Sequence, residues 1–194
     1  MRLHIYIFRH GETYFNEEER FTGWMDSKLA PKGIEDAKKL AEKLKKKKFQ
    51  IAFKTRLSRS GATLNEILRY HLECRKVITD DRMIERSYGI LEGKFHKTVI
   101  AKYGKKQFDI WHRSYAVPPP RGESLKMVEK RVLSFIKDLM NLMKTERANV
   151  AISAHGNSMR PFRRYFEHLT VREMIELENP NDNYFDYAVK SAER

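Results

Sequence analysis

The chain lacks the residues and segments that several classes of protein require. Its 194 residues include one cysteine, Cys74, so no disulfide can form within the chain, and with no Cys/His cluster around it we interpret the thiol as structural. No apolar run approaches the roughly 20 residues of a membrane-spanning helix. The first residues, "MRLHIYIFRHGE", become charged too soon for a secretory signal. We therefore expect a cytoplasmic protein that does not associate with a membrane.

The composition fits one globular domain over residues 1–194, with 41% hydrophobic and 34% charged residues. A net charge of +13 favours anionic partners, either a nucleic acid or a small phosphorylated metabolite. Much of the excess lies in "KKLAEKLKKKK" at 38–48, where lysines at the end of a helix are stabilised by its dipole. No zinc-finger spacing or RNP-like segment supports a nucleic-acid partner. We expect a small phosphorylated ligand and no nucleic acid, and the sequence leaves the oligomeric state open, a homo-oligomer included.

The pattern of apolar residues predicts a three-layer α/β sandwich with a mostly parallel central sheet. Short apolar runs typical of strands occupy residues 3–8, 50–54, 75–79, 149–153 and 184–189. Apolar residues at helical spacing alternate with them, over 34–44, 57–68 and 125–142. Residues 80–123 interrupt this alternation with an aromatic-rich patch and a "VPPP" turn before Ser124, which can cap the long helix. We expect this segment to be an insertion over one edge of the sheet, covering an active site.

Two histidines, each followed by glycine, come directly after predicted strands. Arg9 and His10 follow the first strand, and His155 follows the strand at 149–153. Ligands bind beyond the carboxyl ends of strands in open α/β sheets, so these side chains are expected to meet. Arg56 and Arg59 stand at a third such junction, where a helix begins and an anion is favoured.

This set of residue types suits phosphoryl transfer. Guanidinium groups match the oxygens of a phosphoryl group in a bidentate way, and a neutral imidazole is a competent nucleophile. Glu85, in the inserted segment, can protonate the departing oxygen. Taken singly, Arg-His-Gly fits a surface turn, Glu85 a solvated carboxylate and Arg59 an ion pair. Their combination favours catalysis.

The same segments resemble the histidine phosphatase superfamily and, within it, the cofactor-dependent phosphoglycerate mutases. The resemblance runs from about residue 4 to about residue 180. Its motifs occur in the same order as in the family: "RHGETYFNEEERFTGWMD", "RLSRSGAT", "ERSYGILEG", "WHRSYAVPPP", "ESL" and "SAHGNSMR". The resemblance implies interconversion of 3- and 2-phosphoglycerate in glycolysis and gluconeogenesis, through a phosphohistidine. It also implies 2,3-bisphosphoglycerate as the phosphoryl primer and no metal.

The resemblance also assigns roles to individual residues. It implies that His10 is the phosphorylated nucleophile, that Arg9, Arg59 and His155 form the phosphate pocket, and that Glu85 donates and accepts the proton. The positions that it implies for substrate contacts are Asn16, Thr22, Gly23, Tyr88, His96, His112, Arg113, Gly156 and Asn157.

Some positions depart from the mutase pattern. His96 stands where the family usually has Lys, and His112 with Arg113 stands where it pairs two arginines. The stretch from "VPPP" to "ESL" is also shorter than usual, and the chain stops soon after "DYAV" without the longer tail that helps to close the site. We therefore expect mutase activity accompanied by hydrolysis of bisphosphoglycerate, with hydrolysis rising from about pH 6 to 8 as the two histidines lose charge.

Two alternatives remain at this point. A phosphatase would use the same phosphohistidine with water as the acceptor. A basic module that binds polyanions without catalysis would keep the fold, but it would not need His10, His155, Arg9, Arg59 and Glu85 together.

Overall fold

A five-stranded sheet lies at the centre of the computed structural model, which describes residues 2–190. The strand order is β3-β2-β4-β1-β5, and only β5 runs antiparallel to its neighbour among these strands. The strands are β1 (Arg2–Arg9), β2 (Ile51–Lys54), β3 (Lys76–Thr79), β4 (Val150–Ala154) and β5 (Tyr184–Lys190). Each of the five predicted strands is therefore confirmed, with its ends shifted by a residue or so.

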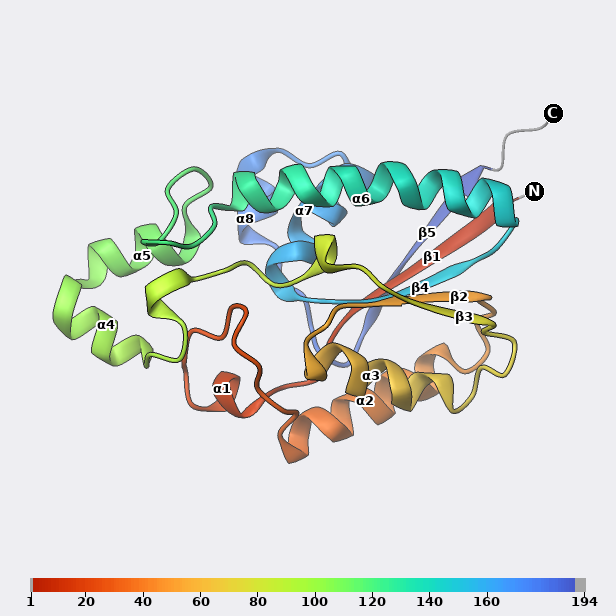
Figure 1. Ribbon diagram of the computed structural model, residues 1–194, viewed down its shortest axis with the longest axis horizontal. Coiled ribbons are helices and arrows are strands. Elements are labelled where there is room, and N and C mark those ends of the chain that lie inside the picture. Colours follow the sequence, from red (N-terminus) through yellow and green to blue (C-terminus); the bar gives the residue numbers. More distant parts are fainter. Residues whose placement is uncertain (1, 191–194) are drawn as a thin grey trace.

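Helices cover both faces of the sheet, which confirms the three layers (Figure 1). The covering helices are α2 (Pro31–Leu44) and α3 (Ser58–Leu68) on one face, and α6 (Leu125–Glu146) and α7 (Gly156–Glu167) on the other. Strand β1 shows why both faces are apolar, since successive side chains of a strand point to opposite sides. Ile5 and Ile7 pack in the cluster under α6 and α7, whereas Tyr6 and Phe8 pack under α2 and α3.

The long helix α6 begins where the sequence predicts. The Ser124 hydroxyl accepts a hydrogen bond from the Met127 amide at 3.2 Å, which satisfies one of the unpaired donors of the first turn. Its buried stripe, including Val128, Val132 and Phe135, packs on the sheet. This helix therefore fixes the position of the segment that precedes it.

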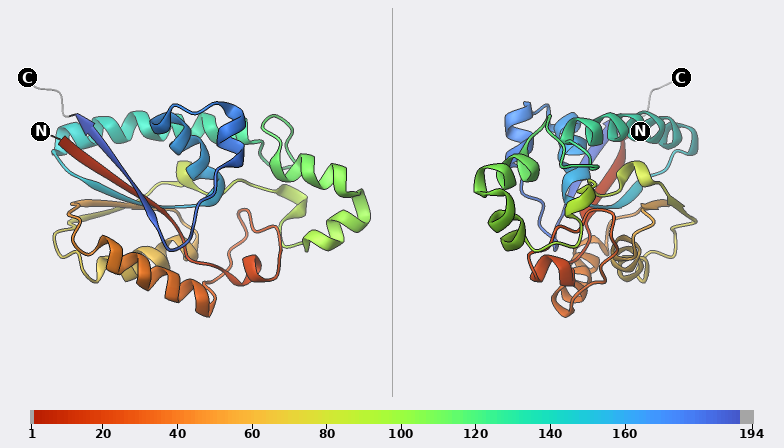
Figure 2. Two further views of the ribbon diagram at one scale, coloured as in Figure 1. Left: turned by 180° about the vertical axis from the view of Figure 1, so that it is seen from behind. Right: turned by 60° about the vertical axis from the view of Figure 1, so that its left-hand side comes forward.

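The inserted segment lies beyond the carboxyl ends of the parallel strands, not along an edge of the sheet as expected (Figures 1 and 2). It comprises two 3₁₀ turns, η1 (Asp81–Met83) and η2 (Gly89–Leu91), and the helices α4 (His96–Tyr103) and α5 (Lys105–Arg113). It has a small core of its own, in which Phe21 from the loop between α1 (Tyr14–Glu17) and α2 packs with Tyr88 and Phe108. That loop is thereby joined to the insertion. This contact places the insertion at the end of the sheet where His10 and His155 emerge.

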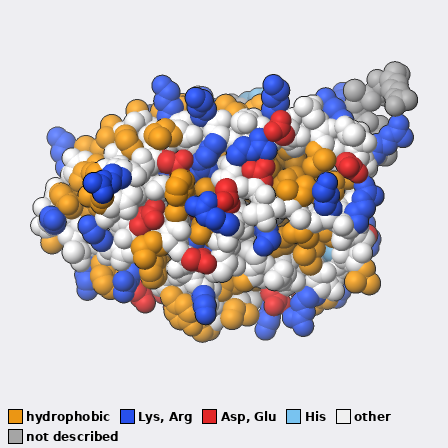
Figure 3. All heavy atoms as spheres, viewed as in Figure 1, with side chains coloured by type: hydrophobic (Ala, Val, Ile, Leu, Met, Phe, Trp, Pro, Cys, Tyr) orange, Lys and Arg blue, Asp and Glu red, His pale blue; other side chains and the backbone are white. Residues whose placement is uncertain are grey.

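The lysine run after α2 is largely paired with carboxylates. Lys45, Lys47 and Lys48 lie within 4.0 Å of Glu42, Asp186 and Glu73, respectively. On the face in Figure 3, Lys and Arg side chains are dispersed among acidic and hydrophobic ones and form no single patch. These contacts agree with a solvated helix end.

Two expectations from the sequence concern a membrane-spanning helix and the end of the chain. None of the helices described between residues 2 and 190 is both long and apolar enough to cross a membrane. Residues 191–194 follow the last described residue, Lys190, so the expectation about a shortened tail lies outside the described residues.

Candidate active site

His10 and His155 lie side by side because β1 and β4 are neighbouring parallel strands. Arg9 pairs in register with Ala154, the His10 amide donates to the Ala154 carbonyl at 3.2 Å, and each strand ends at this level. The two imidazole rings are 5.0 Å apart between centroids and both are buried. The predicted meeting of the two strand ends is therefore confirmed.

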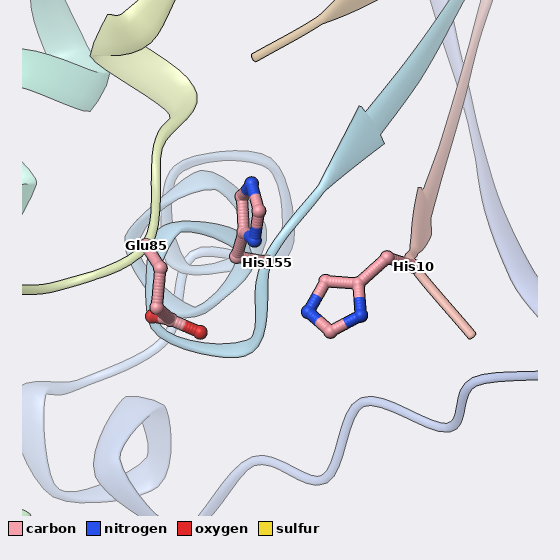
Figure 4. A group of neighbouring side chains, drawn as sticks. All are labelled: His10, Glu85 and His155. Carbon is pink, nitrogen blue, oxygen red and sulfur yellow. The ribbon is translucent and has the colours of Figure 1, made fainter. Parts of the chain in front are cut away.

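One nitrogen of His10 remains available for chemistry. Its Nδ1 donates to the Gly11 carbonyl at 2.7 Å, which leaves Nε2 with a free lone pair directed toward His155 and Glu85 (Figure 4). Burial lowers the pKa of His10 well below its ordinary value, and the Arg59 and Arg9 guanidinium groups lower it further. The ring is therefore neutral near pH 7, as a nucleophile needs to be.

His155 is held at the start of α7. Its Nε2 pairs with the Thr55 hydroxyl at 2.8 Å, and its amide donates to the Ser158 hydroxyl at 3.2 Å. Its Nδ1 is buried and has no partner within the described residues. Burial, together with the charge of Arg59, lowers the pKa of His155 well below its ordinary value. A neutral ring fixed from one side can donate to, or accept from, a group placed between it and His10.

Glu85 reaches the two histidines from the inserted segment. Its Oε1 accepts hydrogen bonds from the Arg86 amide at 2.8 Å and from the Asn157 amide, in the first turn of α7, at 3.1 Å. One nitrogen from each histidine and a carboxylate oxygen of Glu85 all lie within 4.8 Å of one another. A nucleophile, a proton carrier and a second imidazole thus surround one point (Figure 4).

The two predicted arginines occupy different positions around this point. Arg9 lines the open cavity, and its Nη1 donates to the Asn179 carbonyl at 3.3 Å. Arg59 is 1% exposed and donates to the carbonyls of Gly23 at 2.8 Å and Met25 at 3.0 Å, so it supports the Thr22–Gly23 turn from behind. Its charge nevertheless acts on both histidines.

The third arginine that the sequence places at the strand junctions, Arg56, turns away from the site. It pairs with Asp81 at 2.5 Å and lies over the Trp24 ring. Arg56 therefore does not join the candidate phosphate pocket.

A cavity opens beside the two histidines, and most of the predicted substrate contacts line it. The predicted residues along its wall are Arg9, Asn16, Thr22, Gly23, Glu85, Tyr88, His96, His112, Gly156 and Asn157. His10, His155 and Arg59 lie behind that wall. Gly23 has a φ of +54°, which a side chain would strain, and a Cβ there would lie 2.3 Å from the Glu92 carboxylate.

His96 and His112 form an uncharged, aromatic side of this cavity. Their rings lie 5.4 Å apart and both pack against Phe21, at 4.5 and 5.7 Å between centroids. Burial lowers the pKa of His112 to about 3 and also lowers the pKa of His96. Burial therefore argues against the expected loss of charge by His112 between about pH 6 and 8, and it shifts the titration of His96 toward lower pH.

Arg113 does not line the cavity. It is the last residue of α5 and its side chain is exposed, so the structure does not bring it to the cavity wall with the other predicted contacts, and its contact with substrate stays a prediction. The adjoining backbone has a different use, because the carbonyls of Trp111 and His112 accept hydrogen bonds from Arg86.

The structure adds residues to the site that the sequence analysis missed. Arg20, Phe21, Arg160, Glu178 and Asn179 also line the cavity. Arg160 stands within the "SAHGNSMR" segment, one helical turn after Gly156, so its position could have been read from the motif. Glu178 and Asn179 belong to the loop before β5, where no motif marks them.

The same loop also supports the nucleophile itself. Asn181 donates from Nδ2 to the His10 carbonyl at 2.6 Å. No sequence pattern signals this contact.

The grouped donors of His10, Glu85 and His155 are a set that Zn²⁺ accepts in other proteins. Arg9 and Arg59 place positive charge beside the same atoms, which opposes a cation and favours an anion. Activity without a metal stays a prediction.

Comparison with known proteins was consistent with this geometry. Phosphoglycerate mutase from Schizosaccharomyces pombe is 38% identical, over 90% of this chain and 84% of its own length. The 2,3-bisphosphoglycerate-dependent phosphoglycerate mutase of Parvibaculum lavamentivorans is 36% identical, over 89% and 84%. Among solved structures, "Mycobacterial hydrolase 1" has a TM-score of 0.84 at 22% identity, over 97% of this chain and 92% of that one, which shows the shared fold. The family model for the histidine phosphatase superfamily (branch 1) matches residues 5–188, and the chain belongs to that family.

Proposed function

We propose that this protein is a phosphoglycerate mutase that interconverts 3- and 2-phosphoglycerate through a phosphohistidine at His10. The observation that supports this most directly is the geometry at His10, whose free Nε2 faces His155 and Glu85 beside two guanidinium groups. Relatives with this name align over most of the chain. Residues 1–194 are proposed to act as one catalytic domain in the cytoplasm, within glycolysis and gluconeogenesis.

The reaction begins with His10 already phosphorylated by 2,3-bisphosphoglycerate. The 2-hydroxyl of 3-phosphoglycerate attacks the phosphorus, the bond to Nε2 breaks, and Glu85 takes the hydroxyl proton. The bisphosphoglycerate so formed then turns in the cavity. His10 attacks its 3-phosphoryl group, and Glu85 returns the proton to the departing oxygen, which leaves 2-phosphoglycerate and phospho-His10.

The neighbouring groups stabilise the charge on the phosphoryl group during transfer. Arg9 and Arg59 supply fixed positive charge on two sides, and His155 is held in place by Thr55. The start of α7 faces the same region, where the Asn157 amide donates to the Glu85 carboxylate and so orients the proton carrier. Fixed groups of this kind need no rearrangement when the transition state forms.

A phosphatase acting on small phosphorylated metabolites is the second candidate. The uncharged pair His96 and His112 favours it, because a mutase must retain its monophosphate long enough to return the phosphoryl group. The two functions share every step up to phospho-His10 and differ in whether a hydroxyl or water accepts the phosphoryl group.

The deciding assay incubates purified protein with 3-phosphoglycerate, with and without 2,3-bisphosphoglycerate, and measures 2-phosphoglycerate and inorganic phosphate together. The mutase account predicts isomer that greatly exceeds phosphate when the primer is present. Phosphate release without isomer, even with primer, leaves the phosphatase in its place.

A further inference from the structure

The carboxylate of the substrate needs a cationic partner. The resemblance places that partner at His96, His112 and Arg113, but the two histidines lack a charge and Arg113 lies outside the cavity. This inference rests on the proposed function, in which an anionic three-carbon acid must stay bound while its phosphoryl group reacts at His10. His96 and His112 are neutral and pack with Phe21. Arg113 is exposed and does not line the cavity. The charge of Arg113 acts on His112 and Arg160 from outside the cavity, so a cation that lines the cavity is the better candidate for holding the carboxylate.

Among the described residues three guanidinium groups line the cavity; Arg9 has a role at His10 in the proposed mechanism, and Arg20 is in an ion pair. Arg9 lies at the phosphoryl end, where its charge acts on His10. Arg20 stacks on the Phe95 ring at 4.0 Å, and its Nε lies 2.5 Å from the Glu18 carboxylate. Because Glu18 neutralises Arg20, this arginine presents little net charge to a ligand.

Arg160, the third, carries a positive charge and forms no ion pair with a carboxylate among residues 2–190, where the Glu85 and Glu178 charges act on it from farther away. Its Nη1 donates to the Asn157 side-chain oxygen at 2.8 Å and its Nη2 to the Leu177 carbonyl at 3.2 Å, and both acceptors are neutral. Its Nε is buried and has no hydrogen-bond partner in the described part of the chain. Within residues 2–190 no carboxylate oxygen lies within 4.0 Å of it. A largely desolvated cation of this kind favours an anion.

The surroundings of Arg160 suit a carboxylate in position as well as in charge. Asn157, which orients the guanidinium, also donates to the Tyr88 hydroxyl at 3.3 Å and lies next to Gly156 at the start of α7. The charge of Arg160 also reaches the His112 ring, among other cations that act on it. Arg160 therefore lies between the phosphoryl end of the cavity and its aromatic side, where the acid end of a short phosphorylated acid would fall.

We propose that Arg160 is the specificity-determining residue that binds the substrate's carboxylate, and that Asn157 and the Leu177 carbonyl position it. The protein accordingly selects phosphate esters that carry a second anionic group. Because a guanidinium stays charged at any physiological pH, this selection does not change between about pH 6 and 8.

The test compares two ligands that differ in the carboxylate. Isothermal titration calorimetry measures Kd for 3-phosphoglycerate and for glycerol 3-phosphate, with the unmodified protein and with Arg160→Met, Arg160→Lys and Arg113→Met. The unmodified protein should prefer 3-phosphoglycerate. Arg160→Met should weaken 3-phosphoglycerate about 10- to 100-fold while glycerol 3-phosphate stays within about threefold, since one charged contact is lost. Arg160→Lys should keep part of the preference, because it keeps the charge but not the fork.

Several outcomes overturn the inference. The first is that the unmodified protein binds both ligands with the same Kd. The second is that Arg160→Met keeps the preference, or binds both ligands more weakly by the same factor. The third is that Arg113→Met loses the preference. Thermal unfolding of each variant shows whether it folds, and Arg160→Lys keeps the test decisive if the Met variant does not. Binding requires no turnover, so a carboxylate preference in a protein that makes no 2-phosphoglycerate refutes the proposed function and leaves this inference standing.

Discussion

Replacing Glu85 with Gln separates proton transfer from substrate binding. The Glu85 carboxylate accepts two backbone hydrogen bonds at Oε1, from Arg86 at 2.8 Å and from Asn157 at 3.1 Å. A Gln side-chain carbonyl can accept the same two bonds. Within the described residues no hydrogen bond engages Oε2, the atom that the amide nitrogen would replace. The fold and the cavity wall should therefore stay as they are, and only the transferable proton is lost.

The expected loss is large and falls on one kinetic constant. General acid–base catalysis contributes about 10²–10⁴ in rate, or roughly 3–5 kcal/mol of barrier. The variant should therefore lose about 10²–10⁴ in kcat for 2-phosphoglycerate formation, with KM within a fewfold of the unmodified value. Rapid-quench detection of the phosphoenzyme would place the loss in the phosphoryl-transfer steps.

A matched control uses the other carboxylate of the same cavity. Glu178 is exposed and has no contact with either catalytic histidine among the hydrogen bonds and ion pairs of the described residues. Glu178→Gln should keep kcat within about twofold, because it removes a charge without removing the proton carrier. An effect of Glu85→Gln confined to KM, or an equal loss of kcat in Glu178→Gln, would refute the role given to Glu85.

Three further predictions concern the histidines and the metal. His155→Ala should leave a phosphoenzyme that forms about 10²–10³ more slowly, because a stabilising group is lost while the nucleophile remains, and unchanged single-turnover kinetics would remove His155 from the site. The free energy of unfolding should fall as pH drops below about 6.5, since the lowered pKa of His112 keeps it neutral when folded while the unfolded chain takes up the proton. Urea titrations of His112→Phe between about pH 6.5 and about 3 should show a free energy of unfolding that changes less steeply with pH, by up to about 1.4 kcal/mol per pH unit. The same slope as in the unmodified protein would contradict the effect assigned to the burial of His112. Full activity should persist in EDTA, and activity that needs Mg²⁺ or Mn²⁺ to return after chelation would contradict a metal-free mechanism.

The part of the site that the sequence predicts follows from strand ends. His10 and His155 each come directly after a run of apolar residues, and parallel strands bring such positions to one end of a sheet. Local patterns were equally sufficient for the Ser124 cap and the buried stripe of α6. These features depend on neighbours in the sequence or on a regular topology, so the order of the amino acids is enough to derive them.

The remaining features depend on which distant segments pack together. Thr55 reaches His155 and Asn181 reaches His10 across 100 and 171 residues of sequence, respectively, and neither lies in a recognisable motif. The charge state of His112 is set by its burial in the insertion, which the sequence does not specify. Arg113 stands in the "WHRSYAVPPP" motif but is exposed at the end of α5. The motif therefore locates Arg113 in the sequence, but it does not show whether the side chain reaches the cavity.

The most direct test of the central claim is to locate the phosphoryl group on the protein. The purified protein is incubated briefly with 2,3-bisphosphoglycerate, digested at alkaline pH to preserve phosphohistidine, and mapped by mass spectrometry, with His10→Ala treated in parallel. The account predicts an acid-labile phosphate on His10, its absence in His10→Ala, and its discharge when 3-phosphoglycerate is added. A phosphate that maps to another residue, or one that persists in His10→Ala, would contradict the account.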